Sequence, residues 1–215
     1  MMFGIIRLII GCIFFVCSIT AIKKSNVNHK RILHIVFTSL SLILIIVLAF
    51  LPLENLFVTF SSPKAAYEYS NLGKSHIELI VEGDACDFIV DRKNDSYTYF
   101  IIPKTVDGWK IGIGSDTKRI IQKLSNGIVL YVYQYKNTSD YFITILDTSG
   151  GKSTVSDEYN TEFLSLEKHN NSLGETFFIY FAHITDLNPQ YSVMVNDNKI
   201  VVNQSPDGSV SSDEK

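Results

Sequence analysis

Tyrosines that recur at every second position are the residues of this sequence best suited to binding chemistry. Tyr131, Tyr133 and Tyr135 alternate along one apolar run, and Tyr97 and Tyr99 alternate along another. Side chains two positions apart in a β-strand point to the same face, so each run predicts one aromatic stripe. An exposed stripe would hold a sugar or the apolar surface of a partner. These five tyrosines are therefore the candidate ligand-binding residues.

A buried core is the competing interpretation of the same tyrosines. The opposite face of the longer run carries Ile128, Leu130 and Val132, which are apolar as well. A strand that is apolar on both faces is typical of one that is covered on both sides. The sequence favours this core interpretation and leaves the ligand platform as the alternative.

Catalytic chemistry has weaker support in the sequence. Cys86 would act as a nucleophile only with an imidazole beside it as a base, and the candidates are His76, His169 and His183. The spacing pairs none of them with Cys86, and the sequence contains no Gly-x-Ser-x-Gly elbow. We expect Cys86 to be a buried apolar residue, and no catalytic residue is assigned.

One glycine-rich segment resembles the end of a phosphate-binding loop. Residues 150–154 read Gly-Gly-Lys-Ser-Thr. A phosphate-binding loop needs another glycine five positions before the second of these glycines, and Leu146 stands there instead. The segment is therefore predicted to be a flexible turn.

A run of acids raises the question of a calcium site, and its members are Glu82, Asp84, Asp87, Asp91 and Asp95. Calcium takes about six to eight oxygen ligands that converge on one point. Two of these acids flank the apolar residues 88–90, so the acids are expected at turns and strand ends as a solvated rim. No metal site and no cofactor are predicted.

A sheet-rich domain must position these residues. Short turn signals, of which Asn126-Gly127 is the clearest, separate about ten apolar-rich runs in residues 54–204. The predicted strands span 76–82, 86–92, 96–102, 119–124, 128–136, 141–146, 162–167, 176–185, 191–195 and 199–202. Before them, Ser62 and Pro63 predict the N-cap and first position of one short helix. An antiparallel sandwich- or barrel-like body is expected, with two subdomains that meet near residues 112–118 as one option.

Charge is distributed unevenly along the chain. It has 215 residues, of which 46% are hydrophobic and 19% charged, and a formal net charge of −3. Residues 1–53 contain five basic residues and no Asp or Glu, whereas the remainder contains 14 basic and 22 acidic residues. This split excludes a single soluble globule and a basic nucleic-acid binder. It predicts a front end inserted in a lipid bilayer and an acidic, folded remainder.

Two apolar segments predict a transmembrane hairpin. Residues 3–22 carry one charge, Arg7, and residues 32–53 carry none when His34 is neutral. As helices they would reach about 30 and 33 Å, enough to cross a hydrocarbon core of about 30 Å. The alternative for the first segment is a cleaved signal peptide, because Ile9-Ile10-Gly11-Cys12 matches a lipoprotein cleavage box. Only four residues separate Arg7 from Cys12, which is short for the apolar region of a signal.

The segment that joins the two apolar stretches predicts the orientation in the cell membrane. Residues 23–31 contain four Lys or Arg, whereas the far ends offer only Arg7 and Lys64. The positive-inside rule places this loop in the cytoplasm, and the N-terminus and C-terminal domain outside. The expected organisation is a hairpin at 1–53, an extracytoplasmic domain at 54–204 and a disordered tail at 205–215.

Four short patterns lie between the predicted hairpin and the centre of the domain. They are Ser62-Pro63-x-x-Ala66-x-x-Tyr69, Glu82-Gly83-x-x-x-x-Phe88-Ile89-Val90, Ile102-Pro103-Lys104-Thr105 and Gly108-Trp109-Lys110-Ile111-Gly112. Together they resemble small membrane-anchored proteins of AT-rich Gram-positive bacteria that carry no assigned activity. The resemblance spans about residues 60–115, and it implies no catalytic residue.

The expected fold class is α+β, mainly β, with a two-helix hairpin before an antiparallel β-rich domain that carries one short helix. The expected function is a non-enzymatic binding, sensing or accessory role at the membrane. A cell-envelope hydrolase is the first alternative, and it requires one of the three histidines beside an acid or serine in a cleft. The second alternative is an assembly or regulatory partner of another membrane or envelope protein.

Overall fold

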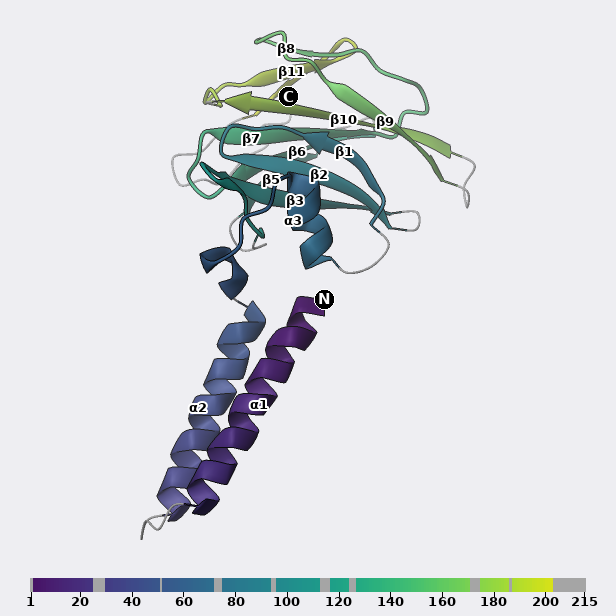
Figure 1. Cartoon of the computed structure of the whole chain (residues 1–215). Helices are drawn as coiled ribbons and strands as arrows, with labels where there is room; N and C mark the ends of the chain where they lie inside the picture. The colour runs from purple at the N-terminus through teal and green to yellow at the C-terminus, as the bar shows by residue number, and fades with distance from the viewer. Residues whose placement is uncertain are drawn as a thin grey trace. The chain divides into compact units, whose positions relative to one another are not determined.

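The chain forms two compact units (Figure 1), which are described separately. The computed structural model describes residues 2–24, 30–50, 52–71, 75–93, 96–112, 117–123, 127–170, 175–185 and 187–202. The first unit comprises Met1–Ser75 and Asp107–Ile113, and the second comprises His76–Val106 and Gly114–Lys215. The predicted tail 205–215 and the centre of the predicted loop 23–31 lie outside the described residues.

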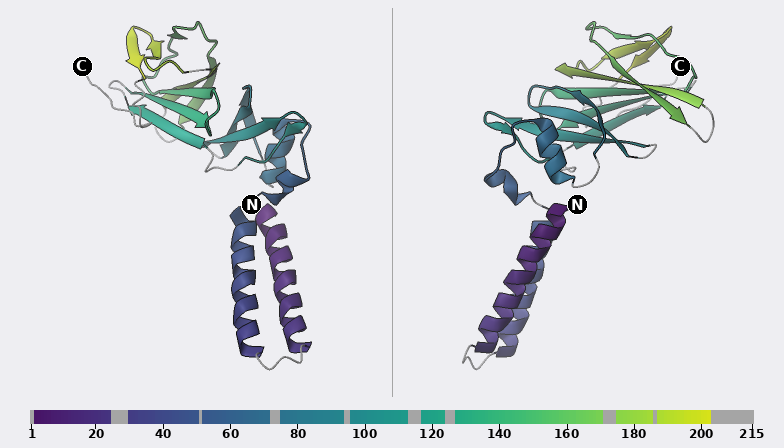
Figure 2. Two further views of the ribbon diagram at one scale, coloured as in Figure 1. Left: turned by 90° about the vertical axis from the view of Figure 1, so that its left-hand side faces the viewer. Right: turned by 45° about the vertical axis from the view of Figure 1, so that its right-hand side comes forward.

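The first unit begins with two long helices that run antiparallel, side by side (Figure 2). They are α1 (Met2–Lys24) and α2 (Lys30–Phe50), and they occupy the two predicted apolar segments. Searched over its described residues, the chain has no helix that is both long enough and apolar enough to cross a membrane. The transmembrane placement of the hairpin therefore stays a prediction.

Small and polar side chains occupy the inward stripe of this hairpin. Gly11 and Ser18 of α1 and Ser41 of α2 are buried. Ser18 Oγ donates to the carbonyl of Phe14, and Ser41 Oγ donates to the carbonyl of Phe37, both at 2.8 Å. Each hydroxyl is thus satisfied within its own helix, as is usual in apolar surroundings.

Large apolar side chains point outward from the same two helices. Those exposed on the described part of the hairpin are Ile9, Ile10, Ile13, Phe14, Val16, Ile32, Ile35, Val36, Leu40, Leu42, Ile43 and Ile46. A helix pair in a soluble domain normally buries such residues and exposes polar ones. The hairpin has the reverse arrangement, with Ile22 as the large apolar side chain that is buried among those whose exposure the structure describes.

The rest of the first unit contains η1 (Leu53–Leu56), α3 (Pro63–Ser70) and the short strand β4 (Gly108–Trp109). The predicted start of the short helix is confirmed. Ser62 is its N-cap and accepts the amide of Ala65 through Oγ at 3.1 Å, and Pro63 occupies the first turn, where a missing N–H costs nothing.

Hydrogen bonds across a long sequence separation fasten the segment after α2. Asn55 Nδ2 donates to the carbonyl of Ile111 at 2.9 Å, and the amide of Ile111 donates back to Asn55 Oδ1 at 2.8 Å. The main chains of Phe60 and Trp109 exchange two further hydrogen bonds of 2.9 and 3.0 Å. These four hydrogen bonds fasten residues 55–60 to residues 109–111 within the first unit.

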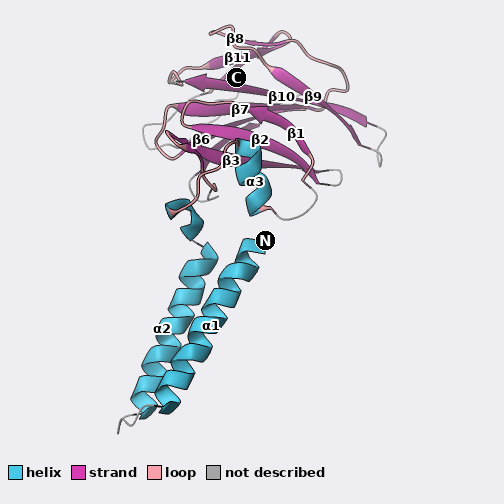
Figure 3. Cartoon of the chain, in the orientation of Figure 1, coloured by secondary structure: helices cyan, strands magenta, loops and turns pink. Residues whose placement is uncertain are grey.

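The second unit consists of antiparallel sheets, which dominate the magenta part of Figure 3. Its first sheet contains β1 (Ile77–Val81), β2 (Cys86–Lys93) and β3 (Ser96–Thr105), each paired with the next. Its second sheet has the order β5-β6-β7-β10-β9. These strands span Thr117–Lys123, Ile128–Tyr135, Asp140–Asp147, Glu175–Thr185 and Leu164–Asn170, in that order.

A third sheet has the order β12-β11-β8. Its strands are β8 (Val155–Asp157), β11 (Ser192–Val195) and β12 (Asn198–Val201). The turn predicted between the last two strands is confirmed, and Asn196 there has a left-handed φ of 53°. β8 was not predicted, because a three-residue strand is too short to carry an alternating pattern.

The five-stranded sheet lies between two apolar cores. One core joins it to the first sheet and contains buried Val81, Cys86, Phe88, Val90, Ile101, Tyr133, Tyr135, Phe142, Ile179 and Phe181. The other core joins it to the third sheet and includes Ile128, Leu130, Val132, Ile143, Ile145, Tyr191 and Val193. Residues 128–136 were predicted to form a strand covered on both faces. This is confirmed by β6, which ends one residue earlier, at Tyr135. The chain is a mainly β, α+β protein with antiparallel sheets.

The predicted solvated rim of acids is wrong for two of its members. Asp87 and Asp91 are only 1% and 6% exposed. Both lie within β2, the middle strand of the first sheet, so they are enclosed rather than placed at its edge. Asp87 Oδ1 accepts the amide of Gly83 at 3.2 Å and so caps the turn that precedes the strand.

Candidate functional site: a tyrosine-lined cavity

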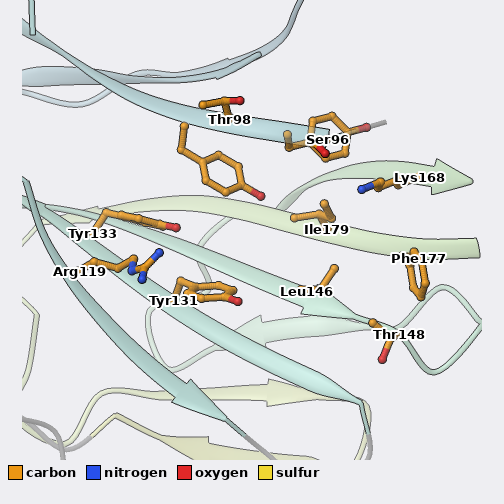
Figure 4. A pocket seen from close by; sticks show the side chains of 12 residues that line it. Ser96, Thr98, Arg119, Tyr131, Tyr133, Leu146, Thr148, Lys168, Phe177 and Ile179 are labelled. Carbon is orange, nitrogen blue, oxygen red and sulfur yellow. The ribbon is translucent and has the colours of Figure 1, made fainter. Parts of the chain in front are cut away.

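Four of the five predicted tyrosines line one cavity of about 600 Å³ in the second unit (Figure 4). Tyr97 and Tyr99 reach it from β3, and Tyr131 and Tyr133 reach it from β6. The remaining lining residues are Ser96, Thr98, Arg119, Leu146, Thr148, Lys168, Phe177 and Ile179. The cavity therefore lies between the first sheet and the five-stranded sheet.

Strand register explains how residues distant in sequence share this wall. Arg119 on β5 is the pairing partner of Tyr133 on β6, so the two side chains lie on the same face. Lys168 on β9 is likewise the partner of Phe177 on β10. The sequence spacing alone contains neither pairing, and for this reason the two cations were not predicted.

The tyrosine rings form a continuous aromatic surface with the core behind them. The ring centroids of Tyr99 and Tyr133 are 5.9 Å apart, and those of Tyr131 and Tyr133 are 6.3 Å apart. Phe88 lies behind this surface at 5.6 Å from Tyr99 and 5.3 Å from Tyr133. Aromatic pairs at such distances are mutually attractive, so the wall is firmly packed.

Two cations lie against tyrosine rings of the cavity. The guanidinium carbon of Arg119 is 6.0 Å from the ring centroid of Tyr131, and Lys168 Nζ is 5.6 Å from that of Tyr97. Figure 4 shows Arg119 beside Tyr131 and Tyr133, and Lys168 on the other side of the cavity near Ile179. Among the described lining residues there is no Asp or Glu, so the charged side chains of this lining are the two cations.

Three of the cavity tyrosines hold their protons more strongly than a tyrosine in water. Burial raises the pKa of Tyr97, Tyr99 and Tyr133. The guanidinium of Arg119 opposes this effect at Tyr133 but does not reverse the direction. Their hydroxyls are therefore neutral hydrogen-bond donors over the whole physiological pH range.

Tyr135, the fifth predicted residue, does not line this cavity. It is 9% exposed and belongs to the core between the first sheet and the five-stranded sheet. Lys136 Nζ lies 5.1 Å from its ring centroid. Tyr133 belongs to the same core and also lines the cavity, whereas Tyr135 belongs to the core alone. The core interpretation therefore fits Tyr133 and Tyr135, and the ligand platform stays a prediction for the four tyrosines of the cavity wall.

A second cluster brings together a histidine, an acid and the cysteine named in the sequence. Asp140 begins β7 and is fully buried. Its Oδ1 lies 2.7 Å from Nε2 of His183, and its Oδ2 accepts the thiol of Cys86 at 3.5 Å. Its two oxygens also accept the amides of Asp84, Ala85 and Cys86 at 2.6–3.0 Å.

The protonation states of this cluster indicate a structural role: Asp140 is held as a carboxylate and Cys86 as a neutral thiol. Burial raises the pKa of Asp140, but the amides of Asp84 and Ala85 and the imidazole of His183 outweigh it, so that the pKa is lowered overall. Burial raises the pKa of the Cys86 thiol, and the charge of Asp140 raises it further. Cys86 is fully buried and is a neutral donor to a carboxylate, as expected for a core residue rather than a nucleophile.

The two remaining motifs contribute no site among the described residues. At the glycine-rich segment, Ser153 Oγ donates to Asp147 and the amide of Ser153 donates to the hydroxyl of Tyr180, so both groups are occupied. The described residues contain no group of three or more His, Cys, Asp or Glu that would hold a metal ion.

Comparison with known protein families, curated proteins and solved structures finds no match to this chain. Within the part of the chain that the structure describes, the cavity offers both a ligand-sized volume and converging functional groups.

Proposed function

We propose that this chain is a membrane-anchored protein whose β-rich domain binds a ligand outside the cytoplasmic membrane. The observation that carries the binding role is the cavity with four tyrosines and two cations in its wall. Aromatic faces, neutral hydroxyl donors and positive charges are groups that recognise a ligand without transforming it. The lining residues that the structure describes include no histidine, cysteine or carboxylate that would serve as a base.

The membrane anchor is supported by the reversed arrangement of the hairpin. Its outward residues, such as Ile13, Leu40 and Ile43, are large and apolar, whereas its inward stripe contains Gly11, Ser18 and Ser41. Helices that pack within lipid place small and hydroxyl-bearing residues against each other and apolar residues outward. In water the same surface would be an extended apolar patch.

The orientation rests on the basic segment 23–31. Its four Lys or Arg favour a cytoplasmic location by the positive-inside rule, which places the N-terminus and the acidic domain outside. The chain has three cysteines, and only Cys86 follows the hairpin. The β-rich domain therefore cannot form an internal disulfide. Its two apolar cores supply the stability instead.

The hydrolase alternative draws on the contact between His183 and Asp140. That carboxylate is fully buried and already accepts three main-chain amides. Neither residue lines the cavity. The third role, assembly partner of another membrane protein, draws on the exposed apolar faces of α1 and α2 and would use the same anchor.

Protease added to intact protoplasts tests the predicted location. We expect the part of the chain after residue 53 to be digested while the cell is intact, because the domain lies outside and the hairpin is shielded by lipid. Immunoblotting against a tag at the C-terminus, beside a cytoplasmic marker, follows the digestion. A domain that survives until the protoplasts are lysed would contradict the proposed location.

Binding of soluble oligosaccharides to the full chain in lipid nanodiscs tests the binding role. For any oligosaccharide that binds, we expect Tyr131→Ala to weaken the binding by about 5- to 150-fold, because stacking on an aromatic ring is lost. The range is that of bases stacked on aromatic side chains, about 1–3 kcal/mol each. Tyr159→Ala is the matched control, because Tyr159 is 45% exposed and lies outside the cavity. Equal effects of the two substitutions would contradict a site at the cavity.

A further inference from the structure

The cavity contains two positive charges in a domain that is otherwise acidic. Residues 54–215 carry 14 basic and 22 acidic residues. Arg119 and Lys168 nevertheless both reach the cavity, and no described carboxylate shares its wall with them. Cations gathered in a cavity attract anionic ligands to it, while the acidic remainder of the domain repels such ligands elsewhere.

The two cations lie at opposite sides of the aromatic wall. Arg119 lies beside Tyr131 and Tyr133, while Lys168 lies on the other side, near Ile179 and Phe177 (Figure 4). A ligand that touches both must extend across the tyrosine rings between them. Its charges must therefore be spaced along a body whose faces stack on aromatic rings.

We propose that the ligand is an acidic oligosaccharide, with sugar rings stacked on the tyrosines and negative groups on successive sugars paired with Arg119 and Lys168. This inference rests on the proposed binding function and adds the chemical class of the ligand. Pyranose rings offer C–H faces for the tyrosines and hydroxyls for the neutral tyrosine O–H groups. The volume of about 600 Å³ lies within the range of about 300–1,000 Å³ that ligand sites occupy.

Single-stranded nucleic acid is another polymer that combines rings with negative charge. Its binding sites track the backbone with many Lys and Arg along a basic groove. The described lining contains only two such residues, and the surrounding domain has a negative net charge. The glycan is therefore the ligand class that the charges favour.

Binding of trigalacturonate to the full chain in nanodiscs of zwitterionic lipid tests this inference. The fully methyl-esterified trimer is the matched neutral ligand, because it keeps the rings and removes the charges. We expect the acid to bind at least tenfold more tightly than the ester, and Arg119→Gln and Lys168→Gln each to weaken the acid about tenfold. The affinity for the ester should change little in either variant. Galacturonate itself should respond to one of the two variants only, since one unit does not span the cavity.

Lys118→Gln is the control variant. Lys118 is the neighbour of Arg119 on β5 and points to the opposite face, where its Nζ donates to Asn137 Oδ1 at 3.1 Å. Lys118→Gln removes one positive charge from the domain, as Arg119→Gln does, but it leaves the cavity wall intact. The variant should therefore bind trigalacturonate as tightly as the unaltered chain does. An equal loss in Lys118→Gln and Arg119→Gln would overturn the inference, because a general charge effect would then account for the binding.

The outcomes separate this inference from the function on which it rests. If the ester binds as tightly as the acid and Tyr131→Ala abolishes both, the binding function stands and the charge selection is wrong. If trithymidylate binds more tightly than trigalacturonate, the ligand class is nucleic acid and the inference is wrong. If the binding of neither a saccharide nor trithymidylate responds to any cavity variant, the proposed binding function fails as well.

Discussion

Replacing Asp140 with alanine is expected to lower the free energy of unfolding by about 4 kcal/mol, because three main-chain amides, an imidazole and a thiol lose their common acceptor. The amides of Asp84, Ala85 and Cys86 donate to its carboxylate at 2.6–3.0 Å. A buried donor left without a partner costs about 1–3 kcal/mol, and Asp140 is fully buried. The loss is a large part of the roughly 5–15 kcal/mol that stabilises a typical domain.

Urea unfolding of the full chain, followed by circular dichroism of its strands, measures this loss. Asp84→Ala is the control, because the side chain of Asp84 is exposed and its main-chain amide still donates to Asp140. Its midpoint should match that of the unaltered chain. A midpoint for Asp140→Ala within error of the control would show that the turn at residues 83–86 does not depend on this carboxylate.

The same carboxylate predicts a dependence of stability on acid. The pKa of Asp140 is lowered in the folded chain, so the folded state binds fewer protons than the unfolded state near the usual pKa of about 3.9. Its stabilisation is present above that pH and is lost as the pH falls further toward the folded value. Asp140→Asn should therefore show a shallower loss of stability than the unaltered chain between about pH 5 and pH 2. If the free energy of unfolding falls equally steeply with pH in Asp140→Asn and in the unaltered chain, Asp140 is not the group responsible.

Replacing Phe88 with alanine is expected to cost about 4 kcal/mol of unfolding free energy, in the range for a buried phenylalanine. Phe88 is 1% exposed and lies 5.2 Å from Phe142 and 6.4 Å from Phe181 between ring centroids. Its loss removes apolar burial and leaves a void between the first sheet and the five-stranded sheet. Because Phe88 also lies behind Tyr99 and Tyr133, ligand affinity should fall along with stability.

Two further substitutions make the test specific. Phe88→Leu keeps most of the apolar volume and should cost only about 1–2 kcal/mol. Phe57→Ala removes a ring that is 86% exposed and should leave the unfolding midpoint unchanged. Denaturant titration of the three variants at one protein concentration gives the order of stability. If Phe88→Leu lost as much unfolding free energy as Phe88→Ala, the void would not be the cause of the loss.

Local chemistry in the sequence predicted most of the strands and the short helix. Ser62 and Pro63 start α3 because a hydroxyl cap and a residue without N–H suit that position whatever surrounds it. The two-sided apolarity of residues 128–135 required a strand covered on both faces, and β6 is such a strand. β8 carried no comparable signal, because its three residues gain their strand form from pairing with β11.

The cavity was only partly predictable. Alternation placed Tyr131 and Tyr133 on one face, and Tyr97 and Tyr99 on one face, because side-chain direction in a strand is a local property. It did not tell Tyr135, in the core, from Tyr131, in the cavity wall, because that depends on where the two sheets separate. It also gave no reason to single out Arg119 or Lys168.

The sequence by itself determined the local properties of this protein: an apolar, acid-free front end, an acidic remainder, and strands with tyrosines on one face. Tertiary structure decided which strands became neighbours, and so which side chains meet. Register between β5 and β6 set Arg119 opposite Tyr133, and the packing of β3 over the five-stranded sheet brought Tyr97 and Tyr99 to the same cavity. Such contacts arise from the fit of whole sheets across long sequence separations, which no spacing of residues along the chain records.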